Sequence, residues 1–187
     1  MFSDQHLRLV YDQKSFDSFL TEPFSKEAIL KQIDRKAAQF GTESRTTIAN
    51  ALMNQYKNTP ISKETQLNIE SIKETNTFTI TTGHQLSLYT GPLYFVIKIL
   101  HVIKMCEELK ATYSDYNFVP VYWMASEDHD FEEIQSLHIF NKKITWEKEA
   151  EGPVGLMDTE GLEAIREEMH ELFKNHPESE IQEVLDA

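Results

Sequence analysis

Residues 76–124 read NTFTITTGHQLSLYTGPLYFVIKILHVIKMCEELKATYSDYNFVPVYWM, and this stretch decides the fold. The run 77–82 is β-branched and aromatic, which is typical of a strand. A helical pattern follows over 93–109, and the consecutive apolar residues of 118–124 are expected of a strand covered on both faces. Strand, loop, helix and strand in this order predict one βαβ unit of a parallel sheet, and therefore an α/β fold.

The helix predicted over 93–109 is expected to be largely buried. Its polar residues form one narrow stripe, and apolar residues cover most of the remaining circumference. The stretch is too short and too charged to span a bilayer. The members of the stripe are Lys98, His101, Lys104 and Glu108.

Helical patterns also precede this unit. Apolar residues recur at helical spacing over 29–40, 48–56 and 67–72. Ser25 is expected to cap the first of these helices, and Gly41 occupies the position that often ends one. Nothing in this region points to chemistry, so it is interpreted as scaffold.

A hairpin and two helices are predicted after the unit. Two apolar runs flank 141–143 and indicate a hairpin. Thr159 is expected to cap a helix over 162–173, and Ser179 to begin another. One βαβ unit is too little parallel sheet for a complete doubly wound domain, so we expect the chain to be a fragment of a larger protein.

Composition excludes several classes of protein. The 187 residues carry 18 Lys+Arg against 31 Asp+Glu, a formal net charge of −13, which repels phosphate backbones and argues against nucleic-acid binding through a basic surface. The single cysteine, Cys106, cannot form an internal disulfide and is expected to be a small core residue. Residues 1–20 show no targeting segment, so the cytoplasm is the expected compartment and no membrane partner is expected.

An acidic loop follows the second predicted strand. Glu127, Asp128 and Asp130 surround His129, which makes this histidine a candidate general acid, or a base oriented by a carboxylate. The same atoms could ligate a divalent cation. The alternative is a solvated acidic loop in which Asp130 caps a helix that starts at Phe131.

A second polar loop follows the first predicted strand. Gly83 permits a tight turn and a close backbone approach, and His84 and Gln85 bring hydrogen-bonding side chains to the sheet edge. Amide groups after Gly91 could hold a phosphate or carboxylate, and Lys98 could reach that anion. The alternatives are an ordinary Gly-Pro helix start and a solvated lysine. Ligands bind at the carboxyl ends of strands in open α/β sheets, so two polar loops there favour a site.

The two loops resemble a known family. The blocks TGHQLSLYTGPLY (82–94) and PVYWMASEDHDFEE (120–133) are similar to the cysteine ligase family of bacillithiol biosynthesis, the BshC family. The resemblance is close over 76–135 and looser on either side. It implies a Rossmann-like core that is only partly present in this chain. It also implies a coiled coil in the longer family members, and a homodimer only in the full-length protein.

The resemblance implies a carbon–nitrogen ligase that joins cysteine to glucosaminyl malate and so completes bacillithiol, a low-molecular-weight thiol. The cofactor stays open, with ATP or another nucleotide as the candidates, and no metal ligand is assigned. The fragment is expected to be inactive alone. Its expected parts are a helical segment at 1–75, the first part of the core with the ligand-site loops at 76–135, and a hairpin and helical segment at 136–187.

Within that resemblance, the residues of both loops take provisional roles. His129, oriented by Asp128 or Glu127, would handle the proton of the attacking amine, and His84 and Gln85 would hold a carboxylate or phosphate. The expected catalytic residues are Glu127, Asp128, His129 and Asp130. The expected substrate- or nucleotide-binding residues are Thr82, Gly83, His84, Gln85, Tyr89, Gly91, Lys98, Trp123 and Ser126.

The sequence departs from the family pattern at two positions. Many members carry glutamine in place of His84, which favours a hydrogen-bonding role there, and members often carry glycine in place of Ser126. Two other readings stay open. One is a metal-dependent hydrolase or transferase with Asp128, His129, Asp130 and His84 as ligands, and the other is a non-catalytic acidic domain that binds a partner.

Overall fold

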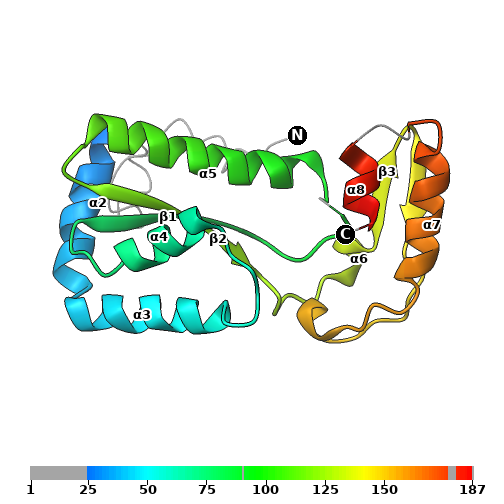
Figure 1. The fold of residues 1–187 in the computed structure, drawn as a ribbon, viewed down its shortest axis with the longest axis horizontal. Coiled ribbons are helices and arrows are strands. Elements are labelled where there is room, and N and C mark those ends of the chain that lie inside the picture. The colour runs from blue at the N-terminus through cyan, green and yellow to red at the C-terminus, as the bar shows by residue number, and fades with distance from the viewer. Residues whose placement is uncertain (1–24, 90, 177–179, 187) are drawn as a thin grey trace, which may run out of the picture. The chain divides into compact units, whose positions relative to one another are not determined.

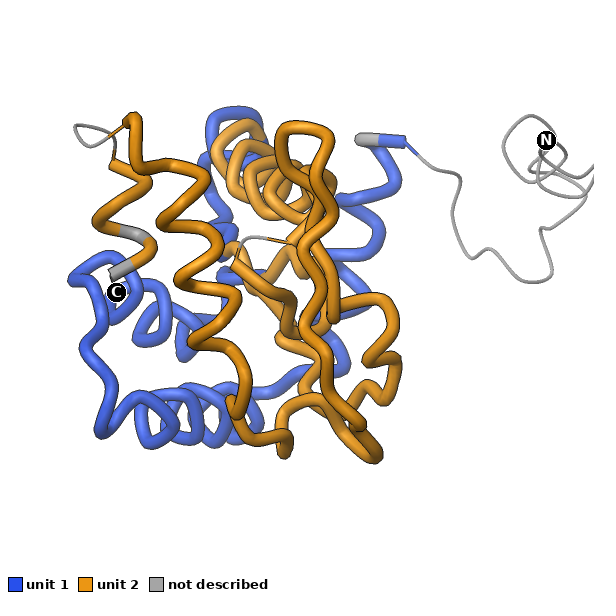
Figure 2. The backbone as a smooth tube through the Cα atoms, turned by 90° about the vertical axis from the view of Figure 1, so that its right-hand side faces the viewer, with its two compact units in different colours: residues 1–78, 109–119 blue, residues 79–108, 120–187 orange. Residues whose placement is uncertain are grey.

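The computed structural model describes residues 25–89, 91–176 and 180–186. These residues divide into two compact units, one within 1–78 and 109–119 and the other within 79–108 and 120–187 (Figure 2). The units do not follow the boundaries expected at 75 and 135, which remain predictions. Each unit is described by itself below.

The first unit contains three helices, α2 (Lys26–Gln39), α3 (Thr42–Gln55) and α4 (Lys63–Ser71) (Figure 1). The Ser25 hydroxyl accepts a hydrogen bond from the Ala28 amide at 3.2 Å, which confirms the predicted N-cap. The Gly41 backbone is extended, with φ −76°, and this residue caps the start of α3. Gly41 directly follows Phe40, the C-cap of α2, so it occupies the predicted position after the first helix, in an extended conformation.

The core of the first unit surrounds a buried arginine. Ala49, Ile69 and Ile72 are buried between α3 and α4. Arg45 is only 2% exposed, and its guanidinium donates to five backbone carbonyls of the same unit. The acceptors are the carbonyl oxygens of Phe40, Ile72, Glu74, Thr75 and Thr77.

The predicted βαβ unit is confirmed. Strand β1 covers Thr77–His84, helix α5 covers Leu93–Thr112 and strand β2 covers Asn117–Met124. The Asn117 amide donates to the Asn76 carbonyl and the Ala125 amide donates to the His84 carbonyl, so both pairs have the same separation along the chain. That constant offset is the signature of a parallel pair. Figure 1 shows α5 running along the sheet.

The expectation that α5 is largely buried is wrong. Leu93, Ile97 and Leu100 are 73%, 52% and 57% exposed, whereas Cys106 and Leu109 are buried. The described sheet has only two strands, and these cover one side of a helix that is apolar around most of its circumference. Cys106 is a core residue as predicted, and burial raises the pKa of its thiol to about 11.

We expect the 187-residue chain to self-associate when it is expressed alone, because the exposed face of α5 is a contiguous apolar stripe. Light scattering coupled to size-exclusion chromatography should show a mass that rises with concentration above the 21.8 kDa of one chain. Ile97→Glu with Leu100→Glu should lower that mass. A clean monomer with a sharp melting transition would contradict this expectation.

The second unit continues into the predicted hairpin. Helix α6 (Phe131–Ile134) leads into β3 (Ser136–Ile139), which pairs antiparallel with β4 (Lys142–Thr145). A short 3-10 turn, η2 (Val154–Leu156), follows. In register, Leu137 faces Ile144, and Ile144 is 1% exposed at the centre of this unit's core.

Two helices close the second unit, α7 (Leu162–Phe173) and α8 (Glu180–Asp186), and they pack against each other. Gly161, with φ +89°, precedes α7 and offers no side-chain cap. The Thr159 carbonyl, not its hydroxyl, accepts from the Leu162 amide, so the predicted Thr159 cap is wrong. The expected helix start at Ser179 lies outside the described residues.

Across the described part of the chain, no helix combines the length and the apolar character needed to cross a membrane.

Candidate functional site

The two polar loops begin side by side at the end of the sheet. The Ala125 amide, just after β2, donates to the carbonyl of His84, the last residue of β1, at 3.1 Å. A Cβ at Gly83 would lie 3.2 Å from both the Cβ and the carbonyl oxygen of Trp123. The close backbone approach predicted at Gly83 is therefore an approach to Trp123 of β2, and Thr82 is the residue of β1 just before Gly83.

A ring of hydrogen bonds joins three elements around Glu133. His84 Nε2 lies 2.6 Å from the Tyr94 hydroxyl, which donates to Glu133 Oε1 at 3.0 Å. Gln85 Nε2 donates to Glu133 Oε2 at 2.6 Å, and His84 Nδ1 lies 2.9 Å from the Gln85 carbonyl oxygen. The ring thus links the end of β1, the start of α5 and α6.

The two nitrogens of the His84 ring have different partners. The Gln85 carbonyl can only accept, so Nδ1 carries the proton that is donated to it. Nε2 faces the Tyr94 hydroxyl and lies 3.9 Å from Glu133 Oε1. The ring therefore fixes the orientation of the imidazole and directs Nε2 toward Tyr94 and Glu133.

Aromatic residues contact His84, a member of this hydrogen-bonded ring. Phe95 meets the His84 ring edge-on at 5.5 Å, and the Tyr122 hydroxyl donates to the His84 carbonyl at 2.7 Å. Burial raises the pKa of Tyr94, and its hydrogen bond to Glu133 and the negative charge there raise it further. Gln85 is 3% exposed, and its Oε1 has no hydrogen-bond partner among the described residues.

Lys98 and Gly91 contact the backbone of their own unit. Lys98 Nζ donates to the Gly83 carbonyl at 2.5 Å and lies over the Tyr94 ring. The Gly91 amide donates to the Leu88 carbonyl, in a turn where Gly91 has φ +61°. A Cβ at Gly91 would meet the Ser87 side chain at 2.9 Å, so glycine is required there.

The acidic loop is organised by its own backbone. Asp130 Oδ1 accepts from the Glu133 amide, which confirms Asp130 as the N-cap of α6. Asp128 Oδ1 accepts from the Asp130 amide, and Glu127 Oε1 accepts from Trp123 Nε1 at 3.2 Å. None of these hydrogen bonds involves the His129 ring, so the carboxylates shape the loop through backbone and indole contacts.

His129 lines an open depression of about 720 Å³ with Asp128, Asp130, Glu132 and Lys148. Lys148 lies over the Trp146 ring and pairs with Asp158 at 2.5 Å; this hydrogen bond is the main cause that lowers the pKa of Asp158. Lys148 thus brings a cation to the wall of the depression that His129 also lines, with Asp158 as its ion-pair partner.

Sequence reasoning missed Tyr94, Tyr122, Glu133 and Lys148. Tyr94 and Glu133 lie inside the two blocks quoted above, but no local pattern indicates that they meet. Lys148 follows the hairpin, and only the fold brings it to the loop of His129.

Two predicted site residues lie away from the ring around Glu133. Tyr89 lines a separate cavity in the same unit. Ser126 packs against Gly155, whose amide donates to the Ser126 carbonyl at 2.9 Å.

This arrangement does not support the alternative hypothesis of a metal site formed by Asp128, His129, Asp130 and His84. Among residues 25–89, 91–176 and 180–186, no group of three or more His, Cys, Asp or Glu side chains is placed to hold a metal ion. His84, one of the four ligands in that reading, is held by Tyr94 and Gln85.

Comparisons with known proteins give the same family as the resemblance of the blocks 82–94 and 120–133. A family model described as "Bacillithiol biosynthesis BshC, N-terminal Rossmann-like domain" matches residues 5–187. Proteins named "Putative cysteine ligase BshC" are 53% identical over 152 residues in Flavobacterium johnsoniae, 49% over 139 in Flavobacterium psychrophilum and 48% over 129 in Cytophaga hutchinsonii. These matches cover 81%, 74% and 69% of this chain, but only 29%, 26% and 25% of the respective relatives.

Proposed function

The chain belongs to the BshC family of bacillithiol biosynthesis, and on that premise we propose that the full-length protein is a ligase that joins cysteine to glucosaminyl malate. The observation that carries the proposal is the identity, up to 53%, with proteins named as cysteine ligases. This chain would supply the first part of the Rossmann-like core together with the two ligand-site loops.

The proposed reaction forms an amide from a carboxylate and an amine. A carboxylate is a poor acceptor, so it must first be activated, normally as an acyl phosphate or an adenylate, and a nucleotide such as ATP is the natural source of that group. The attacking amine must also lose a proton. A histidine within reach of the amine can accept its proton. A nearby cation can bind the carboxylate or the phosphate that activates it.

His129 is our candidate for the proton transfer. Its ring lines the open depression with Lys148, whose charge suits a carboxylate or phosphate. Glu127, Asp128 and Asp130 would fix the loop that carries it. Thr82, Gly83, His84, Gln85, Lys98 and Trp123 would form the supporting side of the site, with Tyr89, Gly91 and Ser126 at its border.

The experiment that tests this function uses the purified full-length protein. Mass spectrometry should detect cysteine-dependent conversion of glucosaminyl malate to bacillithiol, and omission of ATP shows how the carboxylate is activated. Absence of product with every nucleotide tested would count against the ligase.

Glu133→Gln is expected to lower the rate of product formation roughly 10- to 100-fold, because misplacing a supporting residue is enough to disturb a reacting geometry. The change removes the negative charge that His84 faces and one acceptor of the ring. Because the hydrogen bond to Glu133 and its charge raise the pKa of Tyr94, their loss should also move the pH profile of the rate. Glu167→Gln, on the exposed side of α7, is the matched control; equal profiles for both variants would contradict a role for the ring.

Partners and location follow from the same proposal. The substrates would be the small molecules cysteine and glucosaminyl malate, and the net charge of −13 fits neither nucleic acid nor an anionic membrane surface as a partner. A homodimer through a coiled coil is expected only of the full-length protein. The cytoplasm is the expected location.

A further inference from the structure

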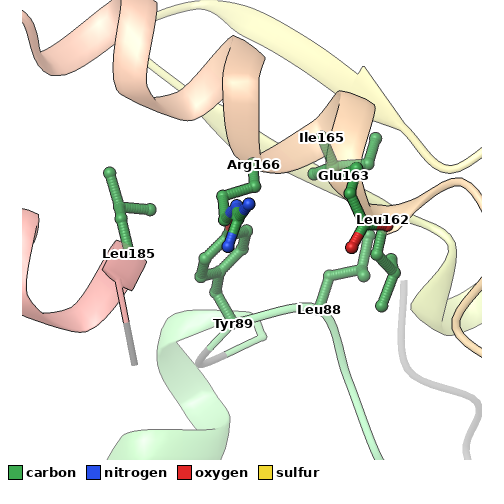
Figure 3. Close-up of a pocket in the computed structure, with 7 residues that line it drawn as sticks. All are labelled: Leu88, Tyr89, Leu162, Glu163, Ile165, Arg166 and Leu185. Atoms are coloured by element: carbon green, nitrogen blue, oxygen red, sulfur yellow. The ribbon is translucent and has the colours of Figure 1, made fainter.

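A cavity of about 260 Å³ lies in the second unit, beside the turn that follows Gln85 (Figure 3). Its apolar wall comes from three elements: the turn contributes Leu88, α7 contributes Leu162 and Ile165, and α8 contributes Leu185. Three of these side chains are less than 10% exposed, so the wall is part of the core.

Two opposite charges border the cavity. Glu163 and Arg166 are three residues apart on α7, a spacing that places their Cβ atoms roughly 5–6 Å from each other. Neither side chain forms an ion pair or a hydrogen bond with another side chain or carbonyl in the described part of the chain. Figure 3 shows both side chains directed toward the turn that carries Tyr89.

Tyr89 adds a third polar group in an uncommon backbone conformation. Its φ is +49°, which is rare for an aromatic residue, and such conformations cluster at ligand sites. The hydrogen bond from the Gly91 amide to the Leu88 carbonyl holds the turn. Tyr89 and Arg166 line the same cavity. Burial raises the pKa of Tyr89, and the positive charge of Arg166 opposes that shift.

We propose that this cavity binds the zwitterion of a small α-amino acid. The Arg166 guanidinium would bind the carboxylate through a bidentate pair of hydrogen bonds, and Glu163 would bind the ammonium group. The wall of leucine and isoleucine side chains would contact a short uncharged side chain of the ligand. The volume supports a ligand of this size, because pockets for larger molecules usually measure roughly 300–1,000 Å³. The identity of the amino acid as cysteine rests on the proposed function; the site itself does not.

The test uses the full-length protein and three probes that differ by one group. L-Cysteine carries both charges, cysteamine lacks the carboxylate, and 3-mercaptopropionate lacks the ammonium group. Calorimetry, run with and without a non-hydrolysable ATP analogue, should show cysteine binding about tenfold or more tightly than either probe, the gain expected from a charge-assisted hydrogen bond.

The variants then assign each charge to one end of the ligand. Arg166→Gln should abolish the preference for cysteine over cysteamine and leave its preference over 3-mercaptopropionate. Glu163→Gln should do the reverse, and Glu167→Gln should change neither. Both tested side chains are exposed, and the buried face of α7 is formed by Ile165, Met169 and Phe173, so the variants should melt like the wild type.

The outcomes separate this inference from the ligase proposal. If the variants bind cysteine as the wild type does, the cavity is not an amino-acid site even where bacillithiol is formed. The same conclusion follows if the wild type binds none of L-cysteine, L-serine and L-alanine. If the probes behave as expected but no bacillithiol is formed with any nucleotide, the site stands and the ligase proposal fails.

Discussion

Replacing Arg45 with methionine is expected to lower the free energy of unfolding by about 3 kcal/mol or more, because it leaves several buried acceptors without donors. Arg45 is 2% exposed and donates to five carbonyls, four of them within the segment 72–77 that leads into β1. Methionine fills a similar space but donates nothing. The carbonyl groups of this segment would then have to accept hydrogen bonds from water, or the segment would have to move.

Two further variants sharpen this measurement. Arg45→Lys keeps the charge but has only three donors on a flexible stem, so an intermediate loss is expected. Lys57→Met, at an exposed position, should change stability by less than about 0.5 kcal/mol. Urea denaturation of dilute protein provides the comparison. A loss for Arg45→Met no larger than that of the control would show that water replaces the guanidinium.

His129→Ala is expected to lower the rate of bacillithiol formation by the full-length protein about 10²- to 10⁴-fold, the usual contribution of one acid–base residue. The side chain is exposed and borders the depression with Lys148, so its removal should leave the fold intact. His138→Ala, which removes an exposed histidine from β3, is the matched control and should keep the wild-type rate.

The size and type of the His129→Ala effect discriminate between roles. A loss in kcat with little change in KM would place His129 at the reacting atoms, whereas a rise in KM alone would make it a binding residue. A wild-type rate would favour the reading of this chain as a non-catalytic acidic domain that binds a partner.

Local patterns in the sequence predicted much of the fold. The β-branched run before Gly83 and the apolar run before Ala125 mark two strands, and the spacing between them leaves room only for a crossover helix. Ser25 and Asp130 act as caps because a short oxygen-bearing side chain before a helix has one obvious partner, the amide three residues on.

The contacts that the sequence did not reveal are long-range. Arg45 is charged and sits on a helix, where the usual expectation is a solvated side chain, and its acceptors are carbonyls, which any residue carries. Glu133 meets Gln85 across 48 positions. The sequence predicted too much burial for α5. An apolar helix face shows that the helix can pack against another element, but it does not show that such an element is present in the chain.

The contact between Gly155 and Ser126 bears on the order in which the molecule folds. The Val154 and Gly155 amides donate to the Asp128 and Ser126 carbonyls, so a segment that follows the hairpin fixes the loop that carries His129. Contacts between distant positions form after local ones, because closing the intervening chain costs entropy. These contacts close 26 and 29 residues (154 − 128 and 155 − 126), fewer than the 41 residues between the paired positions of β1 and β2 (125 − 84). Once the hairpin has been made, the loop of His129 can therefore take its shape before the two parallel strands have paired.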